Sequence, residues 1–331
     1  MVVIRTLRGF MKCIILASAG SPISSVLATY EMLSLASRIA DGNNLLEIEL
    51  VTSHKAKIES SSGFEFAIKQ VYDEVGDADH VIIAPLGRVS DEQLAFKQNV
   101  LDWICLQYEQ GARVISLCTG AFLLAATGLL NHKTATTHWQ YEMLFKTQYP
   151  SINLESHQVM CHEGRLSTSG GANAYQDLIL HHIGEIFGEQ VMKQCAKLLM
   201  LDFGRKSLQM YRTSDVTRQH KDRVVHKLQD WLQQHYQLPF KLEVLADKGC
   251  LSERQIKRRF VKAVGMPPLI YVQYIRVEKA KWFLEHSNAS VDEISHNVGY
   301  QDVRFFRTLF KRHVHVSPSQ YRHEFSNWQR H

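Results

Sequence analysis

The sequence predicts an α/β sandwich followed by an all-α domain with two helix-turn-helix units. Up to about Gly188, short apolar runs alternate with helical periodicity, as in a mainly parallel sheet covered by helices. Beyond Tyr211 there is no strand pattern, and short helical segments alternate with turn signals. The net charge also changes sign. There are 17 basic and 21 acidic residues up to Met210, then 21 basic and 12 acidic residues.

A chain of 331 residues is long enough for two domains. We place them at 11–205 and 222–326, joined by a linker at 206–221 that holds most of the polar stretch RTSDVTRQHKD. The basic second domain suggests a polyanionic partner, and the alternative is a merely solvated basic face.

The cysteines and the N-terminus bear on compartment and cofactors. The six cysteines are scattered, with no CxxC pair and no Cys/His spacing typical of zinc. We interpret the apolar run CIILASAG as a buried strand rather than a signal peptide. No run approaches the roughly 18 apolar residues needed to cross a bilayer. We therefore expect a soluble cytoplasmic protein with reduced thiols, no membrane contact, no metal and no other cofactor.

The elements of the first domain follow from short apolar runs and helical periodicity. The strands are expected at Cys13–Ala17, Leu46–Val51, Val81–Ala84 and Val114–Leu117, with shorter ones near Gln158–Cys161 and Leu166–Thr168. Helical periodicity predicts helices over Ile23–Ala40, Glu92–Tyr108 and Ala174–Ile186.

The stretch ISLCTGAFLL predicts a strand that turns sharply at Cys118 into a helix from Gly120 onward. This places the thiol at the carboxyl end of a central strand, where open α/β sheets bind ligands. A helix N-terminus there can lower a thiol pKa or hold an anion. With His138, the minimum pair for thiol catalysis is present. The expected pocket residues are Cys118, Thr119, Gly120, His138, Gly20, Ser21 and Gly170.

The first unit of the second domain is LEVLADKGCLSERQIKRRFVKAVG, Leu242 to Gly265. A short helix meets a turn at Gly249, and Ser252 is placed to cap a second helix. The inward stripe of that helix holds Ile256 and Phe260, and cationic side chains lie on its other faces. This is the layout of a helix-turn-helix, whose second helix enters the major groove.

A second unit follows in VDEISHNVGYQDVRFFRTLFKRHVHVSP, with its turn at Gly299. Between the units, PLIYVQYIRVEKAKWFLEH predicts a helix of about 18 residues, or roughly 27 Å. Major-groove faces recur about every 34 Å, so one chain can reach two adjacent grooves, with bending of the DNA. We expect six side chains to form the core: Ile256, Phe260, Phe306, Phe310, Trp282 and Tyr321.

Residues 242–325 resemble the AraC/XylS-type DNA-binding domain, in LSERQIKRRF, RVEKAKWFLE and above all VGYQDVRFFRTLFKRHVHVSPSQYR. The resemblance implies that the second helix of each unit reads DNA, through Arg254, Lys257, Arg258, Arg304, Arg307 and Thr308. The DNA-binding surface we expect comprises Ser252, Arg254, Gln255, Lys257, Arg258, Arg259, Gln301, Arg304, Arg307, Thr308 and Lys311.

Residues 12–187 resemble the DJ-1/PfpI superfamily, whose fold is class I glutamine amidotransferase-like. The match rests on CTGAFLLAATGLLNHKTATTHW, with Cys118 at the nucleophile elbow and His138 at the usual histidine. Together with STSGGANAYQDLILHHIGEIFG, it indicates the GlxA-like transcriptional regulators. Catalytic members of the superfamily carry a glutamate just after the first strand. Here that region reads LASAGSPISSV, and Glu31 comes about three helical turns later.

The resemblance implies a transcriptional regulator, commonly an activator, that binds double-stranded DNA as a homodimer. Its first domain would sense a small molecule such as an amino acid or a betaine-like compound, without catalysis. Two alternatives stay open: cysteine-dependent hydrolase or glyoxalase-type activity at Cys118, and a first domain that only provides a dimerisation platform.

Overall fold

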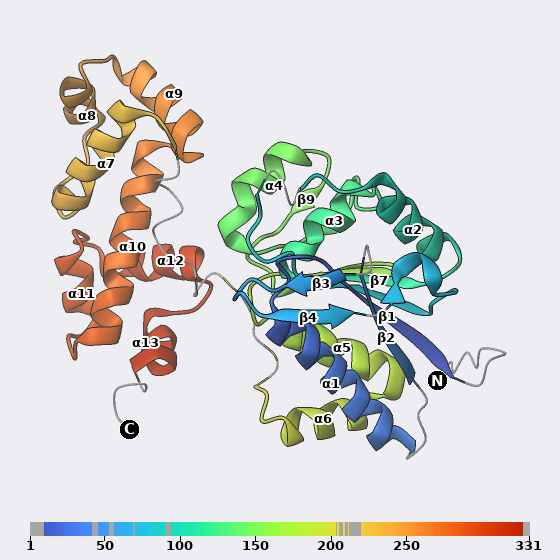
Figure 1. The fold of residues 1–331 in the computed structure, drawn as a ribbon. Helices are drawn as coiled ribbons and strands as arrows, with labels where there is room; N and C mark the ends of the chain where they lie inside the picture. The colour runs from blue at the N-terminus through green and yellow to red at the C-terminus, as the bar shows by residue number, and fades with distance from the viewer. Residues whose placement is uncertain are drawn as a thin grey trace. The chain divides into compact units, whose positions relative to one another are not determined.

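The protein is described from a computed structural model, which covers residues 10–41, 46–52, 56–68, 70–90, 94–202, 204, 208, 211 and 220–326. The chain divides into two compact units, 1–208 and 209–331 (Figure 1). No helix among the described residues is long and apolar enough to cross a membrane.

A seven-stranded sheet forms the centre of the first unit, in the order β10-β11-β7-β6-β1-β2-β5. All its pairings are parallel except that of β10 with β11. Its strands are β1 (Met11–Ala17), β2 (Leu46–Thr52), β5 (Gln70–Val71), β6 (His80–Ile83), β7 (Arg113–Leu117), β10 (Met160–Glu163) and β11 (Leu166–Ser169). Each of the six strands predicted from the apolar runs therefore has a counterpart in the sheet.

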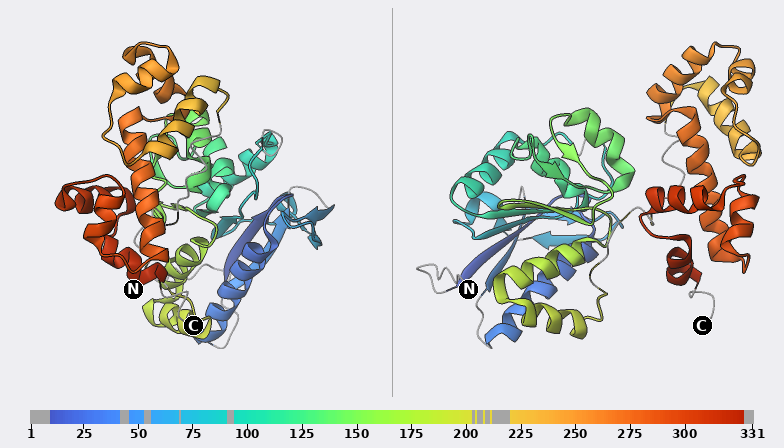
Figure 2. Two further views of the ribbon diagram at one scale, coloured as in Figure 1. Left: turned by 90° about the vertical axis from the view of Figure 1, so that its left-hand side faces the viewer. Right: turned by 180° about the vertical axis from the view of Figure 1, so that it is seen from behind.

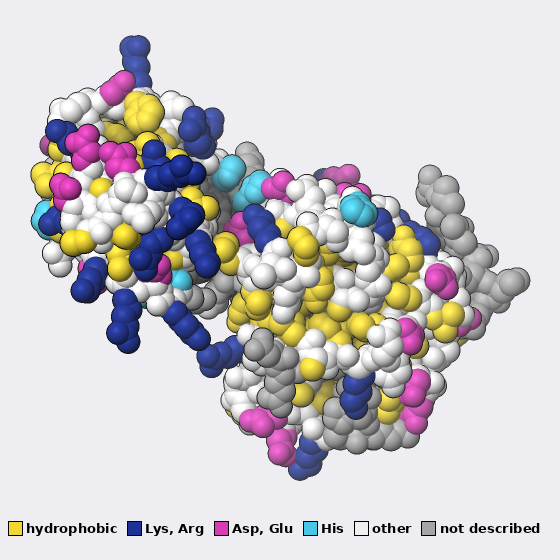
Figure 3. All heavy atoms as spheres, turned by 90° about the horizontal axis from the view of Figure 1, so that it is seen from above, with side chains coloured by type: hydrophobic (Ala, Val, Ile, Leu, Met, Phe, Trp, Pro, Cys, Tyr) yellow, Lys and Arg dark blue, Asp and Glu magenta, His cyan; other side chains and the backbone are white. Residues whose placement is uncertain are grey.

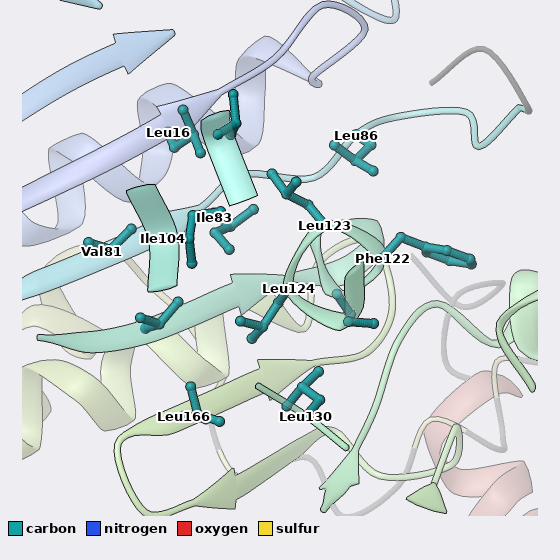
Figure 4. Close-up of a cluster of buried hydrophobic side chains, with 14 of the residues drawn as sticks. Leu16, Val81, Ile83, Leu86, Ile104, Phe122, Leu123, Leu124, Leu130 and Leu166 are labelled. Carbon is teal, nitrogen blue, oxygen red and sulfur yellow. The ribbon is translucent and has the colours of Figure 1, made fainter. Parts of the chain in front are cut away.

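Helices cover both faces of the sheet, which makes the α/β sandwich (Figure 1). On one face lie α2 (Gln98–Glu109), α3 (Ala121–Ala126) and α4 (Glu142–Gln148); on the other lie α1 (Ile23–Asp41), α5 (Tyr175–Phe187) and α6 (Glu189–Leu198). The central strands read as continuous apolar runs because both their faces are buried. In the first core, the α3 side chains Leu123 and Leu124 pack with Ile83 and Ile104 (Figure 4).

One predicted boundary in this unit is wrong, and several elements, among them a hairpin and a helix, were not predicted. The second helix begins at Gln98, not Glu92, because 94–97 form a turn and an extended segment that leads to the cap at Lys97. The hairpin of β3 (Ala56–Glu59) and β4 (Glu65–Ile68) was not predicted, because the segments AKIE and EFAI lack the continuous apolar run that marks the central strands. Helix α6 was not predicted either. It begins directly after Gly188, whose φ of 91° ends α5 and separates the two helices.

Helices alone form the described part of the second unit, and α10 (Pro268–His286) runs through it (Figure 2). Tyr271, Val272 and Ile275 of α10 join the core of the first helical group, and Val277 and Leu284 join the core of the second. The other helices are α7 (Arg223–His235), α8 (Leu242–Gly249), α9 (Glu253–Val264), α11 (Val291–Asn297), α12 (Val303–Val314) and α13 (Pro318–Ser326).

Two helix-turn-helix units repeat at an offset of 50 residues. Ser252 caps α9 and Asp302 caps α12, each through a side-chain oxygen that accepts backbone N–H bonds. Both helices end at a left-handed residue, Gly265 in the first unit and His315 in the second. The buried side chains match at the same offset: Ile256, Phe260 and Val264 correspond to Phe306, Phe310 and Val314.

Two sequence-based expectations for the second unit are wrong. Trp282 is 53% exposed and is not part of the core, because its face of α10 is not covered by a neighbouring helix. The left-handed residue of the first turn is Cys250, and Gly249 is the last residue of α8. A Cβ at Gly249 would lie 2.8 Å from Ile256 Cδ1, so a larger residue there would push on this core side chain. The other five predicted core residues are buried.

A buried histidine pair lies between β6 and α5. The rings of His80 and His182 meet edge to face at 4.6 Å, and His80 Nδ1 and His182 Nε2 have no hydrogen-bond partner among the described residues. Burial lowers the pKa of both, that of His80 to about 3. Nearby, Glu185 pairs with Arg113 and His182. Both imidazoles are therefore neutral in the folded protein.

We expect the free energy of unfolding to fall as the pH is lowered from about 6.5, because the unfolded histidines take up protons that the folded pair cannot. His80→Asn should flatten this slope between pH 4.5 and 6.5, measured by urea unfolding at each pH. Glu185, whose pKa is lowered to about 2, acts in a separate window below its usual range. Parallel curves for the variant and the wild type would contradict the role of His80.

Candidate nucleic-acid interface and ligand pocket

The first recognition helix, α9, presents cations on the side opposite its buried stripe. Arg254, Lys257 and Arg258 are exposed, and none of them pairs with an acidic side chain of the described residues. Figure 3 shows lysine and arginine side chains gathered on the surface of the second unit. Free guanidinium groups on such a helix can donate two hydrogen bonds to a guanine edge or bind phosphates.

Three other residues predicted in this helix are engaged within the protein. Ser252 and Gln255 form a capping box, in which the Gln255 side-chain oxygen accepts from the Ser252 N–H at 2.9 Å. Arg259 is half-buried, and its Nε and Nη2 donate to the two carboxylate oxygens of Asp222 at 2.9 and 2.8 Å. Asp222 also caps α7. Arg259 thus ties α9 to the start of α7.

The second recognition helix, α12, leaves fewer donors free. Arg304 and Lys311 are exposed without an ion pair among the described residues, and Gln301 is exposed just before the helix. Arg307 donates to Asp292 at 2.8 Å, and both side chains are exposed. The Thr308 hydroxyl donates to the Arg304 carbonyl at 3.0 Å. Of the two helices, α9 therefore carries the stronger set of unengaged cations.

The predicted turn at Cys118 lies at the carboxyl end of β7 in a strained conformation. Cys118 has φ 53°, and the 3₁₀ helix η2 (Cys118–Gly120) leads directly into α3. Hydrogen bonds from Cys118 N–H to Ser169 Oγ and from Thr137 to the Cys118 carbonyl hold this turn. Only glycine fits at 120, because a Cβ there would lie 2.8 Å from two backbone oxygens of the β6 end. A non-glycine residue held at positive φ is typical of functional turns.

The Cys118 thiol is protonated at neutral pH. Burial raises its pKa to about 12, although hydrogen bonds from Thr119 act in the opposite direction. The expected lowering by the helix N-terminus is therefore wrong, because the cost of burying a thiolate exceeds what a short helix end returns.

A cavity of about 370 Å³ opens beside this thiol. Of the expected pocket residues, Cys118, Thr119 and His138 line it. The other lining residues come from loops and from the first residues of helices: Pro22, Ser24, Ser25, Ser61, Pro85, Gly87, Arg88, Gln140, Tyr141, Ala172, Asn173 and Tyr175. Among the described residues, Arg88 is the only charged one in this lining, and none of them contributes a carboxylate. A cavity with this charge favours an anionic group.

The other expected pocket residues do not line the cavity but pack against the loops around it. Gly20 backs the loop that carries Arg88, because a Cβ at Gly87 would lie 2.1 Å from the Gly20 carbonyl oxygen. Ser21 is fully buried, and its hydroxyl accepts from the Ser18 N–H. Gly170 packs closely against Thr136 and Leu208. Along with Gly120, these residues shape the turns around the cavity without lining it.

His138 is a neutral wall residue. Its Nδ1 accepts from the Gln140 N–H at 3.2 Å, which leaves the proton on Nε2, and burial lowers its pKa. Arg88 was missed in the sequence, yet it follows β6 closely, and the carboxyl ends of parallel strands meet at one edge. Thr119 holds this loop, since its hydroxyl oxygen accepts from the Leu86 N–H at 2.9 Å. The described residues hold no group of three His, Cys, Asp or Glu side chains suited to a metal ion.

Comparisons with known proteins support both halves. The DJ-1/PfpI family matches residues 23–185, and a helix-turn-helix domain matches residues 245–324. The HTH-type transcriptional regulator CdhR of Pseudomonas aeruginosa is 25% identical over 222 residues, which is 67% of this chain and 66% of that protein. The HTH-type transcriptional regulator GbdR of the same species is 23% identical over 305 residues, 88% of this chain and 81% of that protein.

Among solved structures, a candidate transcriptional regulator from Vibrio parahaemolyticus matches with a TM-score of 0.54 at 22% identity, over 57% of this chain and 99% of its own. This likeness supports the fold of the α/β unit. The chain belongs to the DNA-binding transcriptional regulators in which a DJ-1/PfpI domain is followed by an AraC-type helix-turn-helix domain.

Proposed function

We propose that the α/β domain senses a small carboxylate-bearing molecule in the cavity beside Cys118 and thereby controls DNA binding by the helical domain. The observation that carries the proposal is a cavity of ligand size in which Arg88 is the only charged residue among the described ones that line it. An arginine guanidinium binds a carboxylate through two parallel hydrogen bonds. We expect Arg88 to fix one end of the ligand.

The other cavity walls suggest a compound that is cationic at its second end. Tyr141, Tyr175 and His138 bring aromatic rings to the lining. Ammonium and quaternary ammonium groups are attracted to aromatic faces. An amino acid or a betaine-like compound combines such a group with a carboxylate, so this class fits both ends of the cavity.

We propose further that Cys118 binds or shapes the ligand site and catalyses nothing. Thiol catalysis needs a thiolate and a group that moves protons. The raised pKa of Cys118 opposes the first, and the described lining residues, none of which is a carboxylate, oppose the second. The alternative hypothesis, hydrolase or glyoxalase-type activity, requires substrate turnover by the wild type that Cys118→Ala abolishes. If such turnover were detected, the proposal that Cys118 catalyses nothing would be wrong.

For the mechanism, we propose a homodimer in which the ligand favours one of two arrangements of the α/β domains, and with it one arrangement of the DNA-binding units. The ligand must bind the two arrangements with different affinity, since otherwise it shifts nothing. Leu27 and Tyr30, both exposed on α1, are apolar enough to support a dimer contact. We expect ligand binding to activate transcription, which a reporter fused to the target promoter would test.

A thermal-shift screen of the full chain against amino acids, betaines, polyamines and small acids tests the sensor. At a concentration of 100 times Kd, a ligand stabilises its domain by about 2.7 kcal/mol, or roughly 5 to 10 °C. Arg88→Ala should abolish the shift, because the carboxylate loses its partner. Cys118→Ala and His138→Ala should reduce it.

Arg38→Ala is the matched control, since Arg38 is exposed on α1 and does not line the cavity. A shift that survives Arg88→Ala would place the ligand elsewhere. No shift with any compound would favour the dimerisation platform. Sedimentation velocity on the same samples tests the dimer, and a single-chain mass at all concentrations would exclude it.

A further inference from the structure

One large apolar side chain stands on the DNA-facing helix of the second unit. Phe305, the third residue of α12, is 48% exposed, although Phe306, Leu309 and Phe310 of the same helix are buried. Its ring lies 5.8 Å from that of Tyr300, and water still reaches half of the side chain. The exposed half of the ring is free to contact another molecule.

The first unit shows what this helix position does when it serves the fold. At the offset of 50 residues, Phe305 corresponds to Gln255, whose side chain closes the capping box with Ser252. In α12 the cap is complete without it, because Asp302 accepts the N–H groups of Arg304 and Phe305 at 2.8 and 3.0 Å. Phe305 thus replaces a capping side chain with an apolar group that points to solvent.

Few polar side chains next to Phe305 are free to make hydrogen bonds to a base edge, so an apolar contact with a base is possible at this end of the helix. Arg307 is paired with Asp292, and the Thr308 hydroxyl is bonded to the backbone. Among the described residues, Arg304, Lys311 and Arg312 are the exposed cations of this helix without an ion pair. In helix-turn-helix proteins the N-terminal residues of the second helix contact base edges. The apolar feature of a major-groove edge is the C5-methyl group of thymine, which phenylalanine is known to contact.

We propose that Phe305 contacts the C5-methyl group of a thymine in the half-site of the second unit. The first unit then reads its half-site through hydrogen bonds from Arg254 and Arg258, and the second reads part of its half-site by apolar contact. The cations Arg304 and Lys311 supply the attraction to the phosphates on either side. This inference rests on the DNA-binding function and adds one specificity-determining residue to it.

The test is methyl scanning of the operator. Binding sites are first selected from randomised duplexes with the full-length wild type. Each thymine is then replaced singly by deoxyuridine, which lacks only the methyl group. We expect one position in the second half-site at which this replacement weakens wild-type binding about fourfold, the effect of one buried methyl group. Phe305→Ala should bind thymine and deoxyuridine equally at that position.

Phe305→Gln restores the capping residue of the first unit and should fold well, yet it should also lose the methyl preference. Leu238→Ala is the matched control, since Leu238 is 53% exposed and lies outside both recognition helices; it should keep the preference. The inference is overturned if every thymine gives the same ratio for wild type and both Phe305 variants. If the wild type selects no sequence, DNA reading itself fails, which is a different result.

Discussion

Phe260→Ala is expected to lower the free energy of unfolding of the helical domain by about 3 to 5 kcal/mol, because the removed ring leaves a cavity in a closed core. Phe260 is fully buried, and its ring lies 5.6 Å from that of Tyr271 across α9 and α10. In a domain of about 100 residues this loss lowers Tm by roughly 15 °C or more. Calorimetry of the full chain should show it in one of two transitions.

Phe305→Ala is the matched control for this experiment. It removes the same ring from an exposed position in the other unit, and we expect a change within about 0.5 kcal/mol. Phe260→Ala should also abolish operator binding near its new Tm, since the same helix carries Arg254 and Arg258. A loss below 1 kcal/mol for Phe260→Ala would mean that α9 is not anchored by this contact.

Arg258→Ala is expected to weaken operator binding by about 1 to 3 kcal/mol, if its guanidinium makes a bidentate contact to a guanine. Arg258 is exposed on α9, and no acidic side chain of the described residues neutralises it. The loss should be confined to the base pair that Arg258 reads. Fluorescence anisotropy with the selected operator and with single-base variants measures both effects.

Two further variants separate base reading from charge. Arg223→Ala removes one exposed cation at the start of α7, outside both recognition helices, and should leave sequence preference unchanged. Lys257→Ala should weaken binding to all sequences equally and reduce the salt slope by about one. Unchanged affinity in Arg258→Ala would show that another face of α9 meets the DNA.

The helical domain was largely predictable because its signals are local. Ser252 and Asp302 mark helix starts, and the buried trios recur at helical spacing in both units. Sequence reasoning could not tell which cations are free. Arg259 is held by Asp222, 37 residues earlier in the chain, and Arg307 by Asp292. Such pairings depend on how the helices pack. Helical spacing alone therefore cannot distinguish a paired arginine from an unpaired one on the same face.

The cavity was predictable in place but not in composition. The strand, the turn at Cys118 and the glycine at 120 lie within ten consecutive residues. Local sequence therefore predicts where the buried strand ends and the helix begins, and with it the edge of the sheet that holds the cavity. Arg88, Tyr141 and Tyr175 come from three segments that are far apart in the sequence, a loop, a short 3₁₀ helix and the start of α5, and only the folded sheet brings them together.

The sequence by itself therefore determined the order of the elements, the two domain types and the edge of the sheet where the site lies, since these follow from periodicity, caps and apolar runs. Only the tertiary structure decided the ionisation of the Cys118 thiol, the place of Arg88 in the lining of the cavity, and the exposure of Trp282 and Phe305. Desolvation and side-chain contact depend on which distant segments pack around a residue, and no local pattern records that.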